Sequence, residues 1–148
     1  MNIRKHFGAA ATAVAALLIA IFASFGFAGA KHDKSTFVQF YELRERTLDQ
    51  RGTQKDVERL LTLFAEGAKF EHPTYGVTMN VEQARTGLLA HLGEGIDARY
   101  HIDSARIDED FALVESTLTY VVDGKHVTRR SAAIFEFGGG KILRLAEY

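Results

Sequence analysis

The sequence predicts an α+β domain in which a cone-shaped, curved antiparallel sheet packs against three helices from the N-terminal half. Two observations support this fold class. Apolar residues recur at helical spacing between Phe37 and Leu92, whereas from Ala98 onward they alternate with a period of two. The turns of the second half also place the apolar faces of neighbouring strands on one side. We therefore expect a single domain over residues 31–148, preceded by a signal segment.

The three predicted helices are marked by capping signals at their starts. Ser35 is a plausible N-cap for the first helix, whose apolar face includes Phe37. The segments 53–56 and 80–83 read as capping boxes that open the second and third helices. The second helix is expected to end near Gly67, and the third is expected to end at the glycines after residue 92.

The strands follow from alternation and from turn residues. A short strand over 68–72 is expected to stop at Pro73, with a turn over 74–78. Asp123-Gly124 is the strongest hairpin signal in the chain, and the three glycines at 138–140 mark a second turn. The predicted long strands are 98–107, 111–122, 125–137 and 141–148.

These turns also predict the pairing of the strands. The two-residue Asp-Gly turn places Leu118 opposite Arg129. A three-glycine loop would place Phe135 opposite Leu143 and Ser131 opposite Glu147. Both registers bring the apolar faces to the same side, which the hydrophobic pattern did not by itself require.

The first 30 residues have the pattern of a secretory signal. Arg4 and Lys5 precede an uncharged run over 7–30 that ends in Ala28-Gly29-Ala30. Cleavage after Ala30 would make the protein periplasmic or secreted. The alternative is that residues 7–30 stay uncleaved and anchor the chain in a membrane, because the run is long enough to span a bilayer.

Composition excludes several classes of partner. The chain has a formal net charge of −1, and the signal segment carries two cations and no acid, so the domain itself is more acidic. This argues against nucleic-acid binding, which needs clustered cations. We expect no membrane contact after signal cleavage. With no cysteine and no histidine pair at metal-binding spacing, no metal and no cofactor are expected.

The order of elements and three sequence stretches resemble the nuclear transport factor 2-like superfamily, which includes ketosteroid isomerase and SnoaL-like proteins. The stretches are 37–41 (FVQFY), 63–73 (LFAEGAKFEHP) and 135–142 (FEFGGGKI). The resemblance covers residues 35–148. It implies a sheet that curls into a cone around an internal pocket, helices that close the cone, and a homodimer formed through the outer face of the sheet.

The resemblance also suggests site residues. Tyr41 matches the tyrosine of ketosteroid isomerase, His72 falls where the carboxylate base sits, and Ala133 replaces the acidic oxyanion donor. Steroid isomerisation by that mechanism is therefore not expected. Because histidine titrates near neutral pH, His72 remains a candidate general base with Tyr41 as donor. The structural alternatives are a histidine whose ring is satisfied by a contact with the backbone or with Tyr41, and a tyrosine that only packs.

Three further residues are predicted to bind substrate from their strand positions. Arg129 and Glu147 each share a strand face with core residues, and a charge on an apolar face is normally paired or functional. Tyr120 lies on the same sheet face as Arg129. We expect Arg129 and Glu147 to meet, either as a structural ion pair at the rim of the cone or as part of a binding site.

The sequence thus supports three functions. The first is an enzyme of the isomerase, cyclase or hydrolase type that acts on a small, partly apolar molecule. The second is a non-catalytic module with the same pocket, and the third is an interaction protein that uses the outer sheet face. That face is expected to carry Ile134 and Ile142 among β-branched residues suited to a homodimer contact, which light scattering would reveal.

Overall fold

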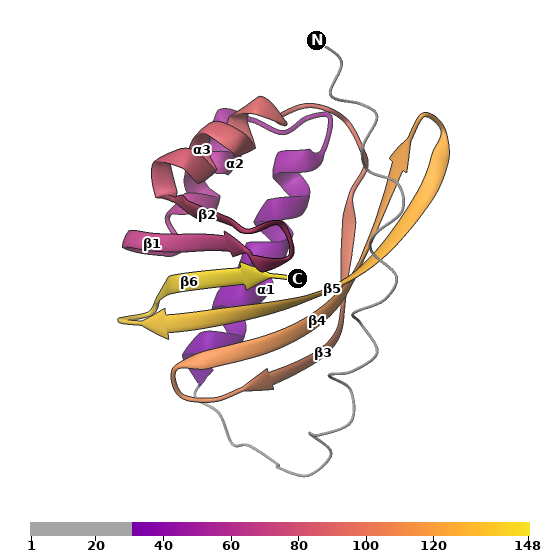
Figure 1. Ribbon diagram of the computed structural model, residues 1–148. Helices are drawn as coiled ribbons and strands as arrows, with labels where there is room; N and C mark the ends of the chain where they lie inside the picture. The colour runs from indigo at the N-terminus through magenta and orange to yellow at the C-terminus, as the bar shows by residue number, and fades with distance from the viewer. Residues whose placement is uncertain (1–30) are drawn as a thin grey trace.

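A computed structural model describes residues 31–148 of the chain; the predicted signal segment lies outside these residues. Three helices lie against a six-stranded curved sheet, which confirms the α+β fold class. Figure 1 shows α1 crossing one face of the sheet, with α2 and α3 beyond its upper edge. No helix in the described part is long and apolar enough to cross a membrane.

The second and third helices begin where their capping signals predict, whereas the first begins at Lys31, four residues before its expected N-cap Ser35. The three helices are α1 (Lys31–Leu48), α2 (Gln54–Leu61) and α3 (Val81–Ala90). The backbone N–H of Thr53 donates to the carboxylate of Asp56 at 3.0 Å. At α3, Asn80 and Gln83 exchange two bonds of 2.9 Å between side chain and backbone. Both pairs satisfy amide groups that a helix start would leave unpaired.

The second helix is shorter than predicted. It ends at Leu61, and strand β1 (Phe64–His72) begins three residues later. The hydroxyl of Thr62 donates to the carbonyl of Arg59 at 2.7 Å and closes the last turn of α2. Phe64 then stacks on Phe70 with ring centroids 4.2 Å apart. The expectation that α2 reaches Gly67 was wrong, since aromatic packing within β1 outweighs the helical pattern.

The sheet contains one strand that the sequence did not predict. A single 3₁₀ turn (Pro73–Tyr75) leads into β2 (Val77–Asn80), which pairs with β1 where a turn was expected. The remaining strands are β3 (Arg99–Ile107), β4 (Phe111–Val122), β5 (Lys125–Gly138) and β6 (Lys141–Glu147). Their order is β2-β1-β6-β5-β4-β3, and the β1–β6 pair is parallel while the others are antiparallel.

One strand register is confirmed and one is corrected. Leu118 faces Arg129, as the Asp-Gly hairpin predicts. Gly138 pairs with Lys141, however, and a bulge follows, so that Leu145 rather than Leu143 faces Phe135. The strand therefore continues one residue further than expected, and an extra residue is accommodated at the bulge.

The bulge changes which side chains face the core. Leu143 is exposed, whereas Ile142, expected on the outer face, is completely buried. Glu147 faces Ala133 and not Ser131. The homodimer stays a prediction, and of its two expected isoleucines only Ile134 remains available to the outer face.

Aromatic rings fill the deep part of the inner sheet face. Phe135 is fully buried, and its ring centroid lies 5.4 Å from that of Phe40 and 6.1 Å from that of Phe37. Leu145 and Phe70 belong to the same buried cluster. The concave side of the sheet is therefore filled at the end where these rings lie, its closed end. The polar groups of the inner face lie beyond these rings.

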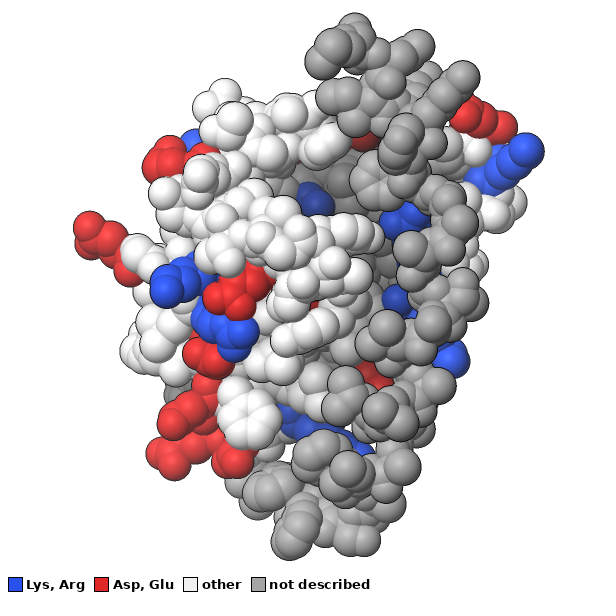
Figure 2. All heavy atoms as spheres, viewed as in Figure 1, with Lys and Arg blue, Asp and Glu red and all other residues white. Residues whose placement is uncertain are grey.

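An ion-pair network on the outer face fixes the parallel β1–β6 contact. The guanidinium of Arg144 lies 2.7 Å from carboxylate oxygens of both Glu71 and Glu136. These hydrogen bonds raise the pKa of Arg144, and they lower the pKa of Glu71. Figure 2 shows basic and acidic side chains side by side over this region of β1 and β6. Because Glu71 and Ala146 are register partners, the residues that follow them lie next to each other on the inner face.

Candidate functional site

The ends of β1 and β6 bring two candidate residues together. Nδ1 of His72 lies 3.8 Å from a carboxylate oxygen of Glu147, and both side chains are about one-third exposed. This separation is too long for a direct hydrogen bond, so a small rotation or a bridging water would be needed to connect the groups. The pair combines two groups capable of proton transfer with access to solvent.

Tyr41 presents a hydroxyl that is buried without a partner. Its side chain comes from α1 and is 4% exposed. Among the described residues, its hydroxyl is the only buried side-chain nitrogen or oxygen with no hydrogen bond. Such groups are rare in folded proteins, which makes this hydroxyl a candidate for binding a ligand. Tyr41 therefore makes no hydrogen bond to His72.

A second tyrosine, Tyr100 on β3, lies against the first. The ring centroids of Tyr41 and Tyr100 are 5.0 Å apart. The backbone N–H of Tyr100 donates to the carboxylate of Glu45 at 2.5 Å, which ties β3 to α1. Sequence reasoning did not select Tyr100, although its position two residues before the apolar Ile102 on an alternating strand is the signal that could have done so.

Burial sets the protonation of both tyrosines. It raises the pKa of Tyr41, and the carboxylate of Glu147 raises it further, while the nearby Ser116 hydroxyl lowers it without meeting hydrogen-bond geometry. Burial raises the pKa of Tyr100 to about 12, opposed mainly by the charge of Arg44. Both hydroxyls thus stay protonated at neutral pH and are available as donors.

Two serines complete the polar region. Ser116 on β4 is 1% exposed, and its hydroxyl lies 3.1 Å from that of Ser131 on β5. Both occupy inward-facing positions, which on the neighbouring pairs are held by Val114 and Ala133. The sequence signal for these serines is a polar residue at a strand position that faces the core. Neither serine was among the predicted site residues. The serines lie between the tyrosines and the His72–Glu147 pair.

Arg129 and Tyr120 meet on the inner sheet face, as predicted, but Glu147, which lies on the same face, does not contact Arg129. The guanidinium carbon of Arg129 lies 5.9 Å from the centroid of the Tyr120 ring. Among the described side chains, Glu147 has His72 and not Arg129 as its ion-pair partner. The expected Arg129–Glu147 contact was wrong, because the β-bulge places Glu147 two residues further from Arg129 along β5 than the simple register implied.

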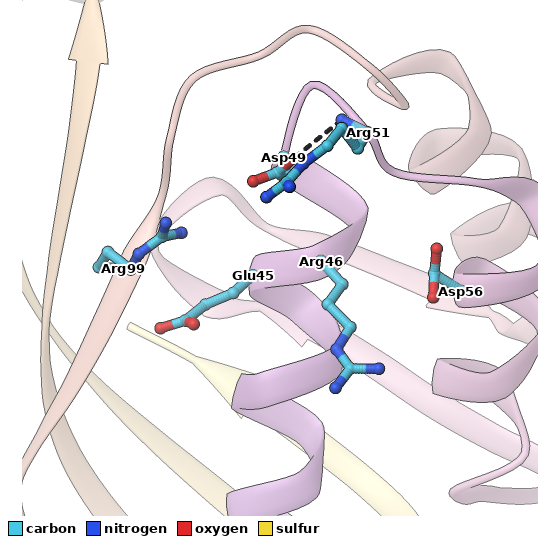
Figure 3. Close-up of a pocket in the computed structure, with 6 residues that line it drawn as sticks. All are labelled: Glu45, Arg46, Asp49, Arg51, Asp56 and Arg99. Carbon is cyan, nitrogen blue, oxygen red and sulfur yellow. Dashed lines mark hydrogen bonds and ion pairs between the residues drawn. The ribbon is translucent and has the colours of Figure 1, made fainter.

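A cavity of about 440 Å³ lies elsewhere, at the end of α1. Six charged side chains line it, none of them a predicted site residue: Glu45, Arg46, Asp49, Arg51, Asp56 and Arg99. Figure 3 shows Glu45 reaching from α1 toward β3 and Arg51 bonded to Asp49. Each acid already has a structural partner, in Tyr100, Arg51 and Thr53 respectively. Because its charges are mixed and largely paired, this cavity is a weaker candidate than the tyrosine region.

The described residues contain no group of three or more His, Asp or Glu side chains placed to hold a metal ion. Glu147 and His72 can accept or donate a proton, and Tyr41, Tyr100 and Ser131 can donate hydrogen bonds to an oxygen.

Raised tyrosine pKa values predict an alkaline loss of stability. Because the pKa of Tyr100 is about 12 in the folded chain and about 10 when unfolded, its contribution is complete below pH 10. It is lost as the pH rises through 12, since ionisation then favours the unfolded state. Absorbance at 295 nm should show a tyrosinate component near pH 12 that Tyr100→Phe removes. Loss of a component near pH 10 in that variant would contradict the assignment.

Comparisons with known proteins agree with the fold. A family model described as a SnoaL-like domain matches residues 39–145, while no curated protein matches the chain. A nuclear transport factor 2-like protein from Anabaena variabilis is similar at 20% identity and a TM-score of 0.64, over 84% of this chain and 94% of that one.

Two other solved structures carry names that mention a ligand or an activity. A Jannaschia protein provisionally named a SnoaL-like polyketide cyclase has 16% identity and a TM-score of 0.63, over 85% of this chain and 90% of that one. A protein of ketosteroid isomerase-like fold from Catenulispora acidiphila, in complex with trimethylamine, has 19% identity and a TM-score of 0.54, over 72% and 82%. At these identities the likeness establishes the fold alone.

Proposed function

The chain belongs to the SnoaL-like domain family, and on that basis we propose that it binds a small, partly apolar molecule at the inner sheet face and carries out acid/base chemistry on it. His72 and Glu147 transfer protons, and Tyr41 donates a hydrogen bond to an oxygen of the substrate. The reaction is of the isomerase, cyclase or hydrolase type. In this proposal the domain is exported and acts in the periplasm or outside the cell.

The unpartnered hydroxyl of Tyr41 is the observation that carries the proposal. A buried hydroxyl without a hydrogen bond costs about 1–3 kcal/mol relative to a satisfied one. A carbonyl or hydroxyl oxygen of a ligand would satisfy it. Tyr100 and the two serines border the same space, so the ligand oxygen would meet several donors at once.

The same arrangement suggests how a proton would move between the substrate and the Glu147–His72 pair. A carbon next to a carbonyl loses a proton to the Glu147–His72 pair, and the developing oxyanion accepts a hydrogen bond from Tyr41. The protonated pair then returns the proton to another carbon or oxygen of the same molecule, which completes an isomerisation or cyclisation. Ala133, which replaces the acidic donor of ketosteroid isomerase, lies directly opposite Glu147 on the neighbouring strand. A carboxylate is thus provided close to that position from a different strand.

A non-catalytic binding or interaction module is the second candidate. The observation that favours it is the aromatic packing of the closed end, where Phe40, Phe135 and Leu145 are all buried. A ligand can then occupy only the polar end near His72, which would suit weak binding or a partner segment as well as a substrate.

Proton exchange on a simple ketone separates these candidates. With 2-tetralone in D₂O, wild-type protein should accelerate deuterium incorporation at the carbon next to the carbonyl, followed by NMR. His72→Asn and Glu147→Gln should each lower the rate at least tenfold, since positioned acid/base groups contribute about 10²–10⁴-fold. His126→Asn, an exposed position on the β4–β5 hairpin, is the matched control and should behave as wild type.

Thermal denaturation must accompany this experiment. Because the His72 side chain is one-third exposed, His72→Asn should retain the fold with little change in Tm. Binding of 2-tetralone without acceleration would identify the non-catalytic alternative. A large loss of stability in His72→Asn, with no change in ligand response, would show that the histidine serves the structure.

A further inference from the structure

Arg44 is a second guanidinium beside the tyrosine region. It lies on α1, one helical turn after Tyr41, and it is half-buried. Tyr100 contacts α1 on both sides of Arg44, through the ring of Tyr41 at 5.0 Å and through the carboxylate of Glu45, so Arg44 lies beside Tyr100. The guanidinium of Arg44 donates to the hydroxyl of Thr47 at 3.5 Å.

Arg129 approaches the same region from the opposite side. Arg129 faces Leu118 on β4, and Leu118 in turn faces Tyr100 on β3. These three side chains therefore form one row across the inner face, with a guanidinium at the β5 end. At the β3 end, Tyr100 lies against the segment of α1 that carries Arg44. The two arginines thus lie at opposite ends of this row, on either side of Leu118.

Neither arginine has an acidic partner among the described side chains. Within the same residues, Arg51, Arg85, Arg99 and Arg144 each lie within 4.0 Å of a carboxylate. Arg129 lies over the face of Tyr120, and Arg44 donates to the hydroxyl of Thr47. Arg44 is half-buried, and a partly buried cation without a counter-ion is costly, so an incoming anion would offset that cost. Arg129 is exposed and is therefore accessible to such an anion.

We infer that the ligand of the proposed site carries an acidic group, such as a carboxylate or sulfonate, which Arg44 and Arg129 bind. This inference rests on the proposed function and specifies its substrate class. Guanidinium groups present paired N–H donors that match the oxygens of such anions. Glu147 does not oppose this placement, because it pairs with Ala133, four residues from Arg129 along β5. At about 3.3 Å per residue that is roughly 13 Å, so the acid lies at one end of the ligand and proton transfer occurs at the other.

Two fluorescent probes of the same ring framework test the inference. 1-Anilinonaphthalene-8-sulfonate carries an acidic group, and N-phenyl-1-naphthylamine lacks it. The full chain should bind both, with the sulfonate preferred. Arg129→Gln and Arg44→Gln should each reduce that preference roughly threefold to tenfold, as expected for a charge-assisted contact that is partly exposed. Raising the salt concentration should also weaken the preference.

Each variant has a control that removes the same charge. Arg130→Gln changes the next residue of β5, whose side chain points to the opposite face, and Arg46→Gln changes the exposed residue two positions after Arg44. Neither should alter the preference. Arg129 is exposed, so its variant is expected to fold even if removal of Arg44 disturbs Tyr100.

The possible results are distinguishable. If neither probe binds, the proposed binding function fails, and this inference fails with it. If both probes bind equally well, the binding function stands and the acidic group is ruled out. A sulfonate preference that persists in both variants, or that falls equally in the Arg46 and Arg130 controls, would show general charge attraction and would also overturn the inference.

Discussion

Replacing Phe135 by alanine is expected to lower the free energy of unfolding by about 3–5 kcal/mol, the range for removal of a buried phenylalanine ring. Phe135 is completely buried, and its ring lies within 6.1 Å, centroid to centroid, of Phe37, Phe40, Tyr41 and Phe137. The change would therefore leave a cavity between α1 and β5. The surrounding rings belong to both α1 and β5 and are closely packed. Neither the helix nor the strand can therefore move far enough to fill the cavity.

Phe111→Ala is the matched control for this variant. Phe111 lies on the adjacent strand, β4, and is 43% exposed, so its loss should cost far less. Urea denaturation of both variants would measure the difference from the transition midpoints, provided that the slopes agree with wild type. Equal destabilisation by the two substitutions would mean that the aromatic cluster is not the main core of the domain.

Local patterns were sufficient for most of the fold. The capping boxes at 53–56 and 80–83 marked the starts of α2 and α3, because they bond neighbouring residues and do not depend on distant contacts. The Asp123-Gly124 hairpin likewise set the pairing of Leu118 with Arg129. A two-residue turn leaves the register of its strands little freedom.

Contacts that depend on tertiary packing could not be predicted in this way. The alternating pattern around Leu143 is compatible with a regular strand, and only the observed pairing shows that one residue is extruded there. Strand β2 is four residues long and is stabilised by its pairing with β1. Such a short segment carries too little periodicity to be recognised without its partner.

The candidate site was predicted only in part for the same reason. Tyr41 and His72 were selected by resemblance, and Glu147 was selected because a charge shared a face with apolar residues. The meeting of His72 with Glu147 depends on the parallel β1–β6 contact between segments more than 70 residues apart, which local patterns do not reveal. Tyr100 and Ser116 face the same region only once α1 lies over β3 and β4.

Two glycine-to-alanine substitutions are expected to change stability in opposite directions. Gly52 lies where the chain turns back after α1, and its amide donates to the carbonyl of Asp49 at 2.9 Å. A methyl group there would lie 2.7 Å from the carbonyl oxygen of Arg46, 3.0 Å from that of Asp49 and 3.1 Å from a methyl of Leu92. Two of these contacts are with backbone, which cannot yield as a flexible side chain can. Gly52→Ala should therefore destabilise the domain by about 1–3 kcal/mol, the usual cost of overpacking.

Gly87→Ala provides the opposite case within the same molecule. Gly87 lies inside α3, where an added methyl group would meet no atom within 4 Å beyond its chain neighbours and the backbone of its own helix. Alanine there restricts the unfolded chain and favours the helix, so a gain of about 0.5–1 kcal/mol is expected. Thermal melts of the two variants beside wild type would show Tm moving down for Gly52→Ala and up for Gly87→Ala. If both shifted Tm downward, the helix interior at Gly87 would be more crowded than the structure shows. If neither shifted it, the turn at Gly52 would have to relax freely. Such relaxation would also displace Arg46 and Asp49, whose side chains line the cavity at the end of α1.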